Sequence, residues 1–125
     1  MQSILIVDDS PVVRRSLRCL LEERAGWQVC GEAENGRQGI DKALELSPHL
    51  ILLDLSMPVM NGLQAARELR RLLPRVPVLM FTTFCNPQIV KEALACGVTE
   101  VRSKSEGVEF LCDRIAHLLQ PRLSD

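Results

Sequence analysis

The sequence predicts an α/β domain in which five parallel strands alternate with five helices. Short, wholly apolar runs at residues 4–7 and 50–53 are typical of strands that are buried on both faces of a sheet. The segments between the apolar runs carry apolar residues every three or four positions, which is the spacing of one helix face. The chain has 125 residues and is 46% apolar, so it can bury one core, and we expect a single domain.

Five segments have the composition of strands. The fourth contains Pro77 near its beginning, where a strand tolerates proline because no ladder hydrogen bond is lost there. The fifth is short and mixes polar with apolar residues. In chain order, the predicted strands cover residues 4–7, 27–31, 50–53, 76–81 and 99–102.

Five further segments have the periodicity of helices, and most have recognisable ends. Ser10 and Asn86 are placed as N-caps before a proline at the first helical position, and Asn61 is a third N-cap. The predicted helices cover residues 10–24, 36–48, 61–74, 86–97 and 108–120. The residues expected to end them are Gly26, Pro48, Pro74, Gly97 and Pro121. The inward positions of the first two helices are predicted to include Leu17, Leu20, Leu21, Ile40, Ala43 and Leu44.

Strand composition also predicts the order of the sheet. The first, third and fourth strands are continuously apolar and should be central, whereas the second and fifth are mixed and should lie at the edges. With right-handed crossovers, the simplest order is 2-1-3-4-5. This is the order of a flavodoxin-like (βα)5 fold, a three-layer sandwich with helices on both faces of a parallel sheet.

Composition excludes several functional classes. Fifteen basic and sixteen acidic residues leave a net charge of -1, so we expect no direct binding of nucleic acid or membrane. No apolar run is long enough to span a bilayer, and residues 1–3 lead into a strand without a signal-peptide pattern, which predicts a cytoplasmic protein. The five cysteines show no Cys-x-x-Cys pairing, so small hydrophobic roles are favoured over disulfides or zinc.

Polar residues follow the central strands at one edge of the predicted sheet. Asp8 and Asp9 end the first strand, Asp54 ends the third, Thr82 follows the fourth, and the fifth leads to Lys104. The carboxyl ends of parallel strands form the edge at which open α/β sheets bind ligands. Carboxylates crowded there raise one another's pKa, so the cluster needs a bound cation or a functional reason.

This combination of groups suits phosphoryl transfer. An oxygen-rich cluster favours a hard cation such as Mg²⁺, a lysine ammonium balances a remaining carboxylate, and a hydroxyl supplies a hydrogen-bond donor. Phosphoryl transfer relies mostly on positioning and charge neutralisation. One carboxylate can then act as the nucleophile.

Over nearly its whole length the chain resembles the receiver domains of two-component response regulators. The resemblance rests on Ile-Val-Asp8-Asp9-Ser, on Leu-Leu-Asp54-Leu-Ser-Met-Pro-Val-Met-Asn-Gly62, on the strand ending at Thr82, and on Lys104. It implies that Asp54 accepts a phosphoryl group from the phosphohistidine of a histidine kinase or phosphotransfer protein. It also implies that Thr82 and Lys104 contact the phosphoryl oxygens. The metal ligands that it implies for Mg²⁺ are Asp8, Asp9, Asp54 and the backbone carbonyl of Ser56.

Three positions depart from the usual receiver pattern. Ser105 replaces the proline that commonly follows the lysine, and a non-proline cis bond would cost about 3 kcal/mol, so we expect a trans bond after Lys104. Val101 replaces an aromatic ring that turns inward on activation in many receivers, so the signal must travel differently. Thr83 replaces a smaller residue. We expect Phe84 and Ser56, on either side of the acyl phosphate, to set its lifetime by controlling access of water.

Other functions have weaker support. A phosphohydrolase with an aspartyl nucleophile, similar to haloacid dehalogenases, would need an aspartate where Ser56 stands. A nucleotide-binding loop at residues 31–36 has suitable glycines but lacks the following Lys-Ser/Thr, and we interpret it as a strand end and turn. A degenerate receiver that acts only as a protein-binding module is disfavoured because the acceptor, acidic pair, threonine and lysine are all present.

The resemblance implies a phosphorylation-dependent switch without a separate substrate. We expect residues 1–125 to form one receiver domain without an output domain. Phosphorylation should change binding to an unidentified downstream protein target, or to a second copy, through the face of the fourth helix, fifth strand and fifth helix. The polar residues that could line this face are Lys91, Glu92, Glu100, Arg102, Glu109 and Asp113.

Overall fold

A computed structural model describes residues 1–120. Strands and helices alternate along the chain as predicted, with one additional 3-10 turn. The strands are β1 (Gln2–Val7), β2 (Trp27–Ala33), β3 (Leu50–Leu53), β4 (Val78–Thr82) and β5 (Glu100–Ser103). The helices are α1 (Pro11–Glu22), α2 (Gly36–Leu46), α3 (Gly62–Leu72), α4 (Pro87–Ala95) and α5 (Val108–Leu119), and the turn η1 (Lys104–Glu106) precedes α5.

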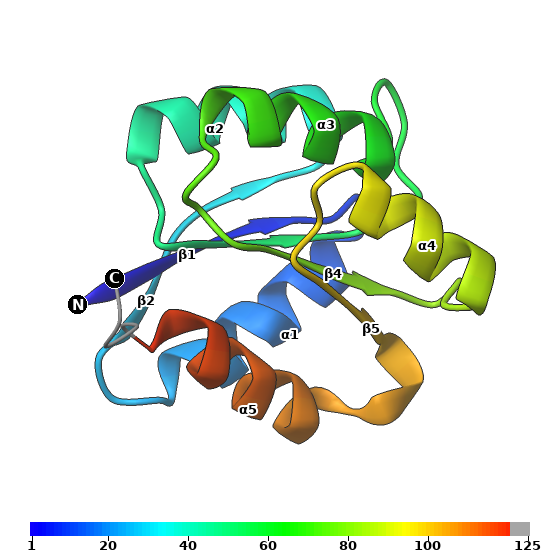
Figure 1. Cartoon of the computed structure of the whole chain (residues 1–125). Helices are drawn as coiled ribbons and strands as arrows, with labels where there is room; N and C mark the ends of the chain where they lie inside the picture. Colours follow the sequence, from blue (N-terminus) through cyan, green and yellow to red (C-terminus); the bar gives the residue numbers. More distant parts are fainter. Residues whose placement is uncertain (121–125) are drawn as a thin grey trace.

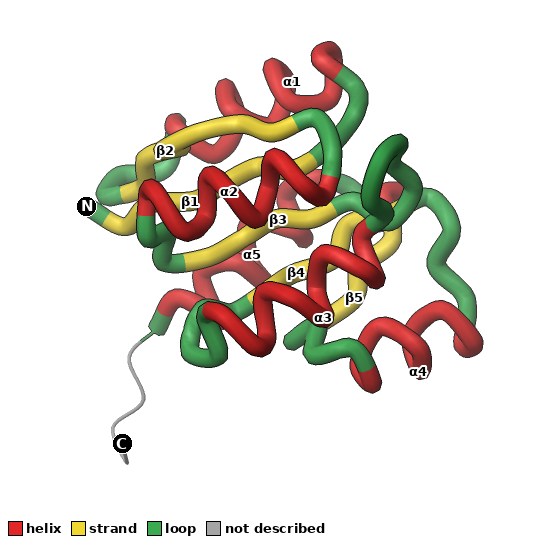
Figure 2. The backbone as a smooth tube through the Cα atoms, turned by 90° about the horizontal axis from the view of Figure 1, so that it is seen from above, coloured by secondary structure: helices red, strands yellow, loops and turns green. Residues whose placement is uncertain are grey.

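The five strands form one parallel sheet in the order β2-β1-β3-β4-β5, which confirms the predicted topology. The sheet lies between two layers of helices, and the strand order can be followed from above in Figure 2. All four residues of β3 are buried, because helices cover both of its faces. The three-layer sandwich is therefore also confirmed.

Each face of the sheet has its own hydrophobic core. Leu5 and Val7 of β1 pack with buried residues of α2, α3 and α4 on one face. Ile4 and Ile6 pack on the other face with α1 and α5, two helices that lie together on one side of the sheet in Figure 1. This alternation is the two-residue period of a strand, and it explains why a central strand must be apolar at every position.

The prediction that Leu20 and Leu44 face inward is wrong. Leu20 is 37% exposed and Leu44 is 48% exposed. Each helix meets the sheet along a narrow stripe that its neighbours already fill: Leu17 and Leu21 in α1, and Ile40 and Ala43 in α2, are at most 3% exposed. A side chain one position away from such a stripe is rotated by about 100° and faces solvent.

Several boundaries differ from the prediction by a few residues. β2 continues to Ala33, because parallel pairing with β1 extends to the pair Val7 and Ala33. β4 begins at Val78 rather than residue 76 and includes Thr82. Every helix also ends before its predicted stop signal, as α2 does at Leu46. Pro121, the expected end of the last helix, lies outside the described residues.

The cysteines occupy different environments. Cys96 and Cys112 are buried, as expected of small hydrophobic residues, whereas Cys19 is exposed. Within residues 1–120, no helix combines the length and apolar character that crossing a membrane requires.

Candidate functional site

The acidic pair Asp8 and Asp9 lies close to Asp54 because β1 and β3, the strands that they follow, are neighbours in the sheet. Val7 and Leu53 are paired across the two strands, and the Asp54 N–H donates a hydrogen bond to the Val7 carbonyl at 2.9 Å. On the other side of β1, the Asp8 N–H donates to the Ala33 carbonyl at 3.0 Å. Asp8 and Asp54 thus lie at the same edge of the sheet, and hydrogen bonds between neighbouring strands determine the positions of their backbones.

The structure brings the three predicted carboxylates together. Asp8, Asp9 and Asp54 each offer an oxygen, and these atoms all lie within 4.8 Å of one another. Asp8 and Asp54 are only 3% and 8% exposed, whereas Asp9 is open to solvent. Within residues 1–120 no hydrogen-bond donor contacts the Asp9 carboxylate, so its position depends on the backbone that carries it.

Lys104 brings a positive charge into the same cluster. Its Nζ lies 3.0 Å from Asp8 Oδ2 and 3.5 Å from Asp54 Oδ2. The same nitrogen lies 6.0 Å from the centre of the Phe81 ring. The lysine therefore bridges two of the three carboxylates and partly compensates their repulsion.

The setting of Asp54 raises the pKa of its carboxyl group to about 6. Burial is the largest cause, because removing the carboxylate from water disfavours its charged form, and the charge of Asp8 acts in the same direction. The Lys104 ammonium and the Leu55 N–H, which donates to Asp54 Oδ1 at 2.8 Å, oppose the increase. Asp54 is thus the carboxylate of the cluster whose charge is costly to maintain.

Two glycines hold the backbone around Asp54, for a reason that composition alone does not reveal. A Cβ on Gly62 would collide with the Asp54 carbonyl oxygen and lie 2.9 Å from Leu55 Cα. Gly62 also donates its N–H to the Leu55 carbonyl at 2.8 Å. Residues 54–61 form the loop between β3 and α3. Near the end of this loop, the Met60 carbonyl accepts a hydrogen bond from the Gly36 N–H at 2.9 Å. The loop is therefore packed against the first residues of α2 and α3.

Thr82 is completely buried at the end of β4, and its Oγ1 accepts a hydrogen bond from the Phe84 N–H at 3.2 Å. Thr82 pairs with Ser103, the last residue of β5, and Lys104 follows directly as the first residue of η1. Because the hydroxyl acts as an acceptor here, its hydrogen is free to be donated elsewhere. Ser56 is exposed, two residues beyond Asp54.

The three departures from the usual receiver pattern have clear structural settings. Val101 is buried in β5. The peptide bond after Lys104 is trans, as predicted. Ser105 donates its N–H to Ser103 Oγ at 3.2 Å, which holds the turn η1 in place. Thr83 is exposed, and Phe84, which follows it, is 59% exposed.

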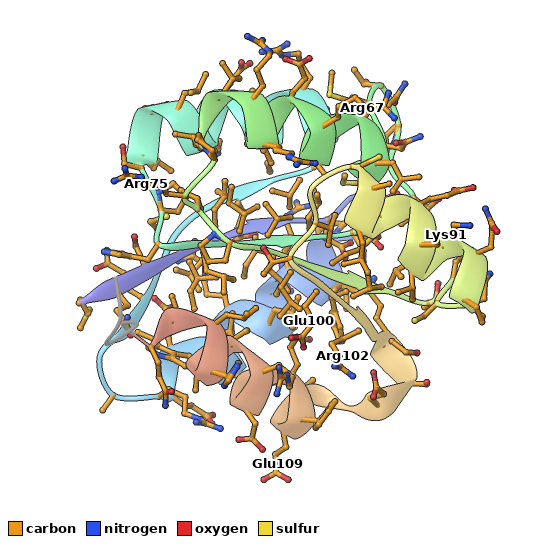
Figure 3. The ribbon with its side chains drawn as sticks, in the orientation of Figure 1. Arg67, Arg75, Lys91, Glu100, Arg102 and Glu109 are labelled. Atoms are coloured by element: carbon orange, nitrogen blue, oxygen red, sulfur yellow. The ribbon has the colours of Figure 1, made fainter. Side chains whose placement is uncertain are left out.

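The predicted docking face is partly engaged within the molecule. Glu100 accepts two hydrogen bonds at 2.7 Å from Arg114 and one at 2.8 Å from Arg102, which lies next to it in Figure 3. Asp113 pairs with Arg24 at 3.3 Å, so it faces the end of α1. Lys91 and Glu109 project outward (Figure 3). Only part of the predicted set is therefore free for a partner.

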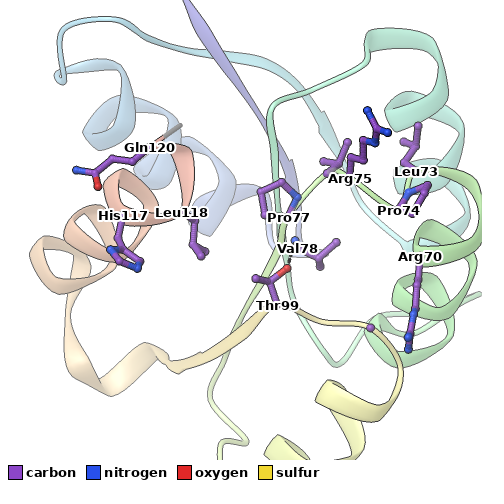
Figure 4. Close-up of a pocket in the computed structure, with 12 residues that line it drawn as sticks. Arg70, Leu73, Pro74, Arg75, Pro77, Val78, Thr99, His117, Leu118 and Gln120 are labelled. Atoms are coloured by element: carbon purple, nitrogen blue, oxygen red, sulfur yellow. Dashed lines mark hydrogen bonds between the residues drawn. The ribbon is translucent and has the colours of Figure 1, made fainter. Parts of the chain in front are cut away.

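A hollow of about 940 Å³ lies far from the acidic cluster, at the opposite edge of the sheet. Its wall includes Arg70, Arg75, Thr99 and His117 (Figure 4). It contains none of the predicted site residues. The segment from Gly31 to Gly36 is likewise a strand end and the beginning of α2, as expected.

Comparison with known proteins identifies relatives of this chain. The chain matches the response regulator receiver domain family over residues 4–116. It is 38% identical over 125 residues to a protein-glutamate methylesterase/protein-glutamine glutaminase of Hahella chejuensis, a match that covers 98% of this chain and 32% of that protein. It is 36% identical over 112 residues to the response regulator protein VraR of Staphylococcus aureus, covering 90% of this chain and 54% of VraR.

A solved structure agrees with the fold. The response regulator domain of CheB from Thermotoga maritima superposes with a TM-score of 0.84 at 25% identity, covering 95% of this chain and 93% of that domain. The chain spans about a third to a half of the length of the two curated relatives. The similarity thus concerns only one part of those proteins.

Proposed function

Because this chain belongs to the response regulator receiver domain family and is a phosphoacceptor of two-component signalling, we propose that Asp54 takes the phosphoryl group. One observation supports Asp54 over Asp8, the other buried carboxylate of the cluster. Both oxygens of Asp8 accept hydrogen bonds, from the Ser10 N–H at 2.9 Å and from Lys104 at 3.0 Å. Asp54 Oδ1 is held by Leu55, whereas its Oδ2 has only the 3.5 Å ion pair and keeps lone pairs for attack.

In the proposed reaction, Asp54 Oδ2 attacks the phosphorus of a phosphohistidine on a histidine kinase or phosphotransfer protein. The Oδ2–P bond forms, the P–N bond breaks, and the imidazole nitrogen leaves with the electron pair and takes up a proton. Lys104 neutralises charge on the phosphoryl oxygens. Thr82 donates its free hydroxyl hydrogen to one of them, and its acceptor role toward Phe84 is compatible with that donation.

We propose that Mg²⁺ is the cation of this site, held by Asp8, Asp9, Asp54 and the backbone carbonyl of Ser56. The donor chemistry fits, because carboxylate and carbonyl oxygens are the ligands that Mg²⁺ prefers. The charges fit too, since three carboxylates and one ammonium leave two negative charges, which one divalent cation neutralises. When bound, the ion supplies positive charge that offsets repulsion between the cluster and the incoming phosphoryl group.

The proposed output is a change in binding rather than turnover of a substrate. Phosphorylation replaces the single negative charge of the Asp54 carboxylate by about two negative charges on the phosphoryl group, beside Lys104 and Thr82. Lys104 is the first residue of η1, which precedes α5, and Thr82 is the last residue of β4, which precedes α4. A shift of both residues toward the phosphoryl oxygens would therefore move the α4–β5–α5 face. An unidentified protein target, or a second copy of this chain, is the proposed reader of that face. We further propose that residues 1–125 act as one receiver unit.

The test is to incubate the protein with Mg²⁺ and acetyl phosphate or phosphoramidate and to measure intact mass. We expect the wild type to gain one phosphoryl group, which a chelator prevents, and Asp54→Asn to gain none. Asp41→Asn is the matched control, because Asp41 is an exposed carboxylate on α2 paired with Arg37, and it should be labelled like the wild type. An unlabelled wild type, or a labelled Asp54→Asn variant, would contradict the proposal.

A further inference from the structure

Arg14, on the first turns of α1, reaches back to the end of β1. Its Nη1 donates a hydrogen bond to the Asp8 carbonyl oxygen at 2.6 Å, and its Nε donates to Glu32 Oε1 at 3.1 Å. The side chain is 14% exposed. One guanidinium group thus joins α1 and β2 to the peptide that connects the two acidic residues.

Glu32 keeps this guanidinium in position. Its carboxylate also accepts a hydrogen bond from Arg18 Nε at 2.7 Å. Burial by itself would raise the pKa of Glu32, but the hydrogen bonds and charges of Arg18 and Arg14 outweigh it and lower that pKa. Glu32 is therefore an ionised anchor at neutral pH, and Arg14 lies between this anchor and the Asp8 carbonyl.

The contact matters because the position of Asp9 depends on the backbone on either side of it. The Asp8 N–H donates a hydrogen bond to the Ala33 carbonyl, and Asp8 Oδ1 accepts one from the Ser10 N–H, so the N–H and the side chain of Asp8 are both held. Arg14 binds the Asp8 carbonyl oxygen, which belongs to the peptide group that joins Asp8 to Asp9. Among residues 1–120 no donor restrains the Asp9 carboxylate itself, so the direction of the peptide decides where that carboxylate lies.

We propose that Arg14 is a positioning residue for the cation site, which places the Asp9 carboxylate through its hydrogen bond to the Asp8 carbonyl. This inference rests on the proposed cation site at Asp8, Asp9 and Asp54. A simple charge effect has the opposite sign: removing a positive charge near a cation site should strengthen cation binding. Positioning demands that removal of Arg14 weaken it, as loss of a residue that orients metal ligands does.

The experiment compares Mg²⁺ affinity of Arg14→Met and Arg18→Met by isothermal titration calorimetry. Both variants lose one positive charge at Glu32 and keep an apolar stem, but only the first loses a contact to Asp8. We expect Arg14→Met to bind Mg²⁺ about tenfold more weakly and Arg18→Met to stay within about twofold of the wild type. Circular dichroism in a chelator verifies that each variant is folded.

The outcomes separate the two explanations. Equal or tighter Mg²⁺ binding by Arg14→Met overturns the proposal, and so does an equal loss in both variants. If Arg14→Met does not fold, Arg14→Lys decides: it keeps the charge but cannot donate in the planar fork to two partners, so weaker binding is again expected and unchanged binding overturns the proposal. Phosphorylation of the wild type on Asp54 is measured separately, so failure of the proposed function is distinguishable.

Discussion

The Lys104 ammonium donates a hydrogen bond to Asp8 Oδ2 at 3.0 Å although 96 positions separate the two residues in the chain. The lysine side chain is 20% exposed and the aspartate side chain 4% exposed, so the pair is largely shielded from water. The Lys104 ammonium thereby neutralises part of the negative charge that would otherwise attract a cation to the cluster. Binding of a cation and the ion pair are therefore coupled.

Replacing Lys104 by methionine should have opposite effects on cation binding and on chemistry. Without the ammonium, the cluster carries one more negative charge, and we expect Mg²⁺ affinity to increase by roughly threefold to tenfold. Phosphorylation by acetyl phosphate should slow by at least about tenfold, because a charge that stabilises the transferring group is missing. Titration calorimetry and the time course of intact mass measure the two effects.

Lys91→Met is the matched control, because Lys91 is an exposed lysine on α4. It should change neither quantity by more than about twofold, since exposed charges are screened by water and salt. Weaker Mg²⁺ binding by Lys104→Met would show that the lysine supports the cation site rather than competing with it.

Removing the Asp54 charge should stabilise the metal-free protein. The raised pKa, about 6 in the folded state against an ordinary value of 3.8, means that the folded chain holds the Asp54 proton more tightly than the unfolded chain. Unfolding free energy therefore falls as pH rises from about 4 to 6, and it stays lower above that range. In a chelator at pH 7.5 we expect Asp54→Asn to be more stable by about 1 to 2 kcal/mol, allowing for solvent screening.

Urea unfolding followed by circular dichroism checks this expectation. The advantage of Asp54→Asn should disappear near pH 4, where the wild-type carboxyl is protonated when folded. Asp41→Asn is the control, and it should show no such pH-dependent gain because Asp41 is exposed. A stability difference that does not change between pH 4 and 7.5 would contradict the assignment.

Substitution of Gly62 by alanine should disturb the acceptor loop. The added methyl group would meet backbone atoms of Asp54 and Leu55, which cannot rotate away as a side chain can. We expect a loss of about 2 kcal/mol in unfolding free energy and slower phosphorylation of Asp54. Urea unfolding and the labelling time course measure the two effects.

Gly26→Ala separates general destabilisation from damage to the site. Gly26 has a φ of 87° and no atom near its missing Cβ, so alanine there introduces strain of about 1 kcal/mol far from Asp54. This variant should lose stability but keep the wild-type labelling rate. If both glycine variants are labelled normally, close packing of Gly62 against Asp54 has no functional role.

The exposed loops beside Asp54 should control the lifetime of the acyl phosphate. Phe84 is 59% exposed, and its backbone N–H donates a hydrogen bond to Thr82 Oγ1, so its backbone is held beside Thr82. We expect Phe84→Ala to admit water and to speed dephosphorylation by roughly threefold to tenfold, a change of about 1 kcal/mol in barrier. Ser56→Asn introduces an amide that can orient water, and a faster decay is expected there too.

The decay is followed by intact mass after removal of the phosphodonor. Phe110→Ala is the control, because the Phe110 ring is 38% exposed but packs against Arg102, with 5.2 Å between guanidinium carbon and ring centre. Unchanged decay rates in both Phe84→Ala and Ser56→Asn would refute a gating role for these positions.

Elements whose sequences carry both a period and an end signal were predictable. α1 begins at Pro11 behind the Ser10 cap, and α4 begins at Pro87 behind Asn86, as expected. Strand ends were less predictable: β2 gains Glu32 and Ala33 through pairing with β1, and the local sequence does not show how far a neighbouring strand extends. The exposure of Leu20 has the same cause, since the width of a buried stripe depends on the packing partner.

The sequence by itself determined the alternation of strands and helices, the order of the sheet, and the edge at which Asp8, Asp9, Asp54, Thr82 and Lys104 gather. Local periodicity and the apolar content of each strand carry that information. Only the tertiary structure decided that Lys104 bridges Asp8 and Asp54, that Gly62 packs on the Asp54 backbone, and that Arg14 holds the Asp8 carbonyl. These contacts join separate elements, so their geometry follows from how helices pack on the sheet rather than from any local pattern.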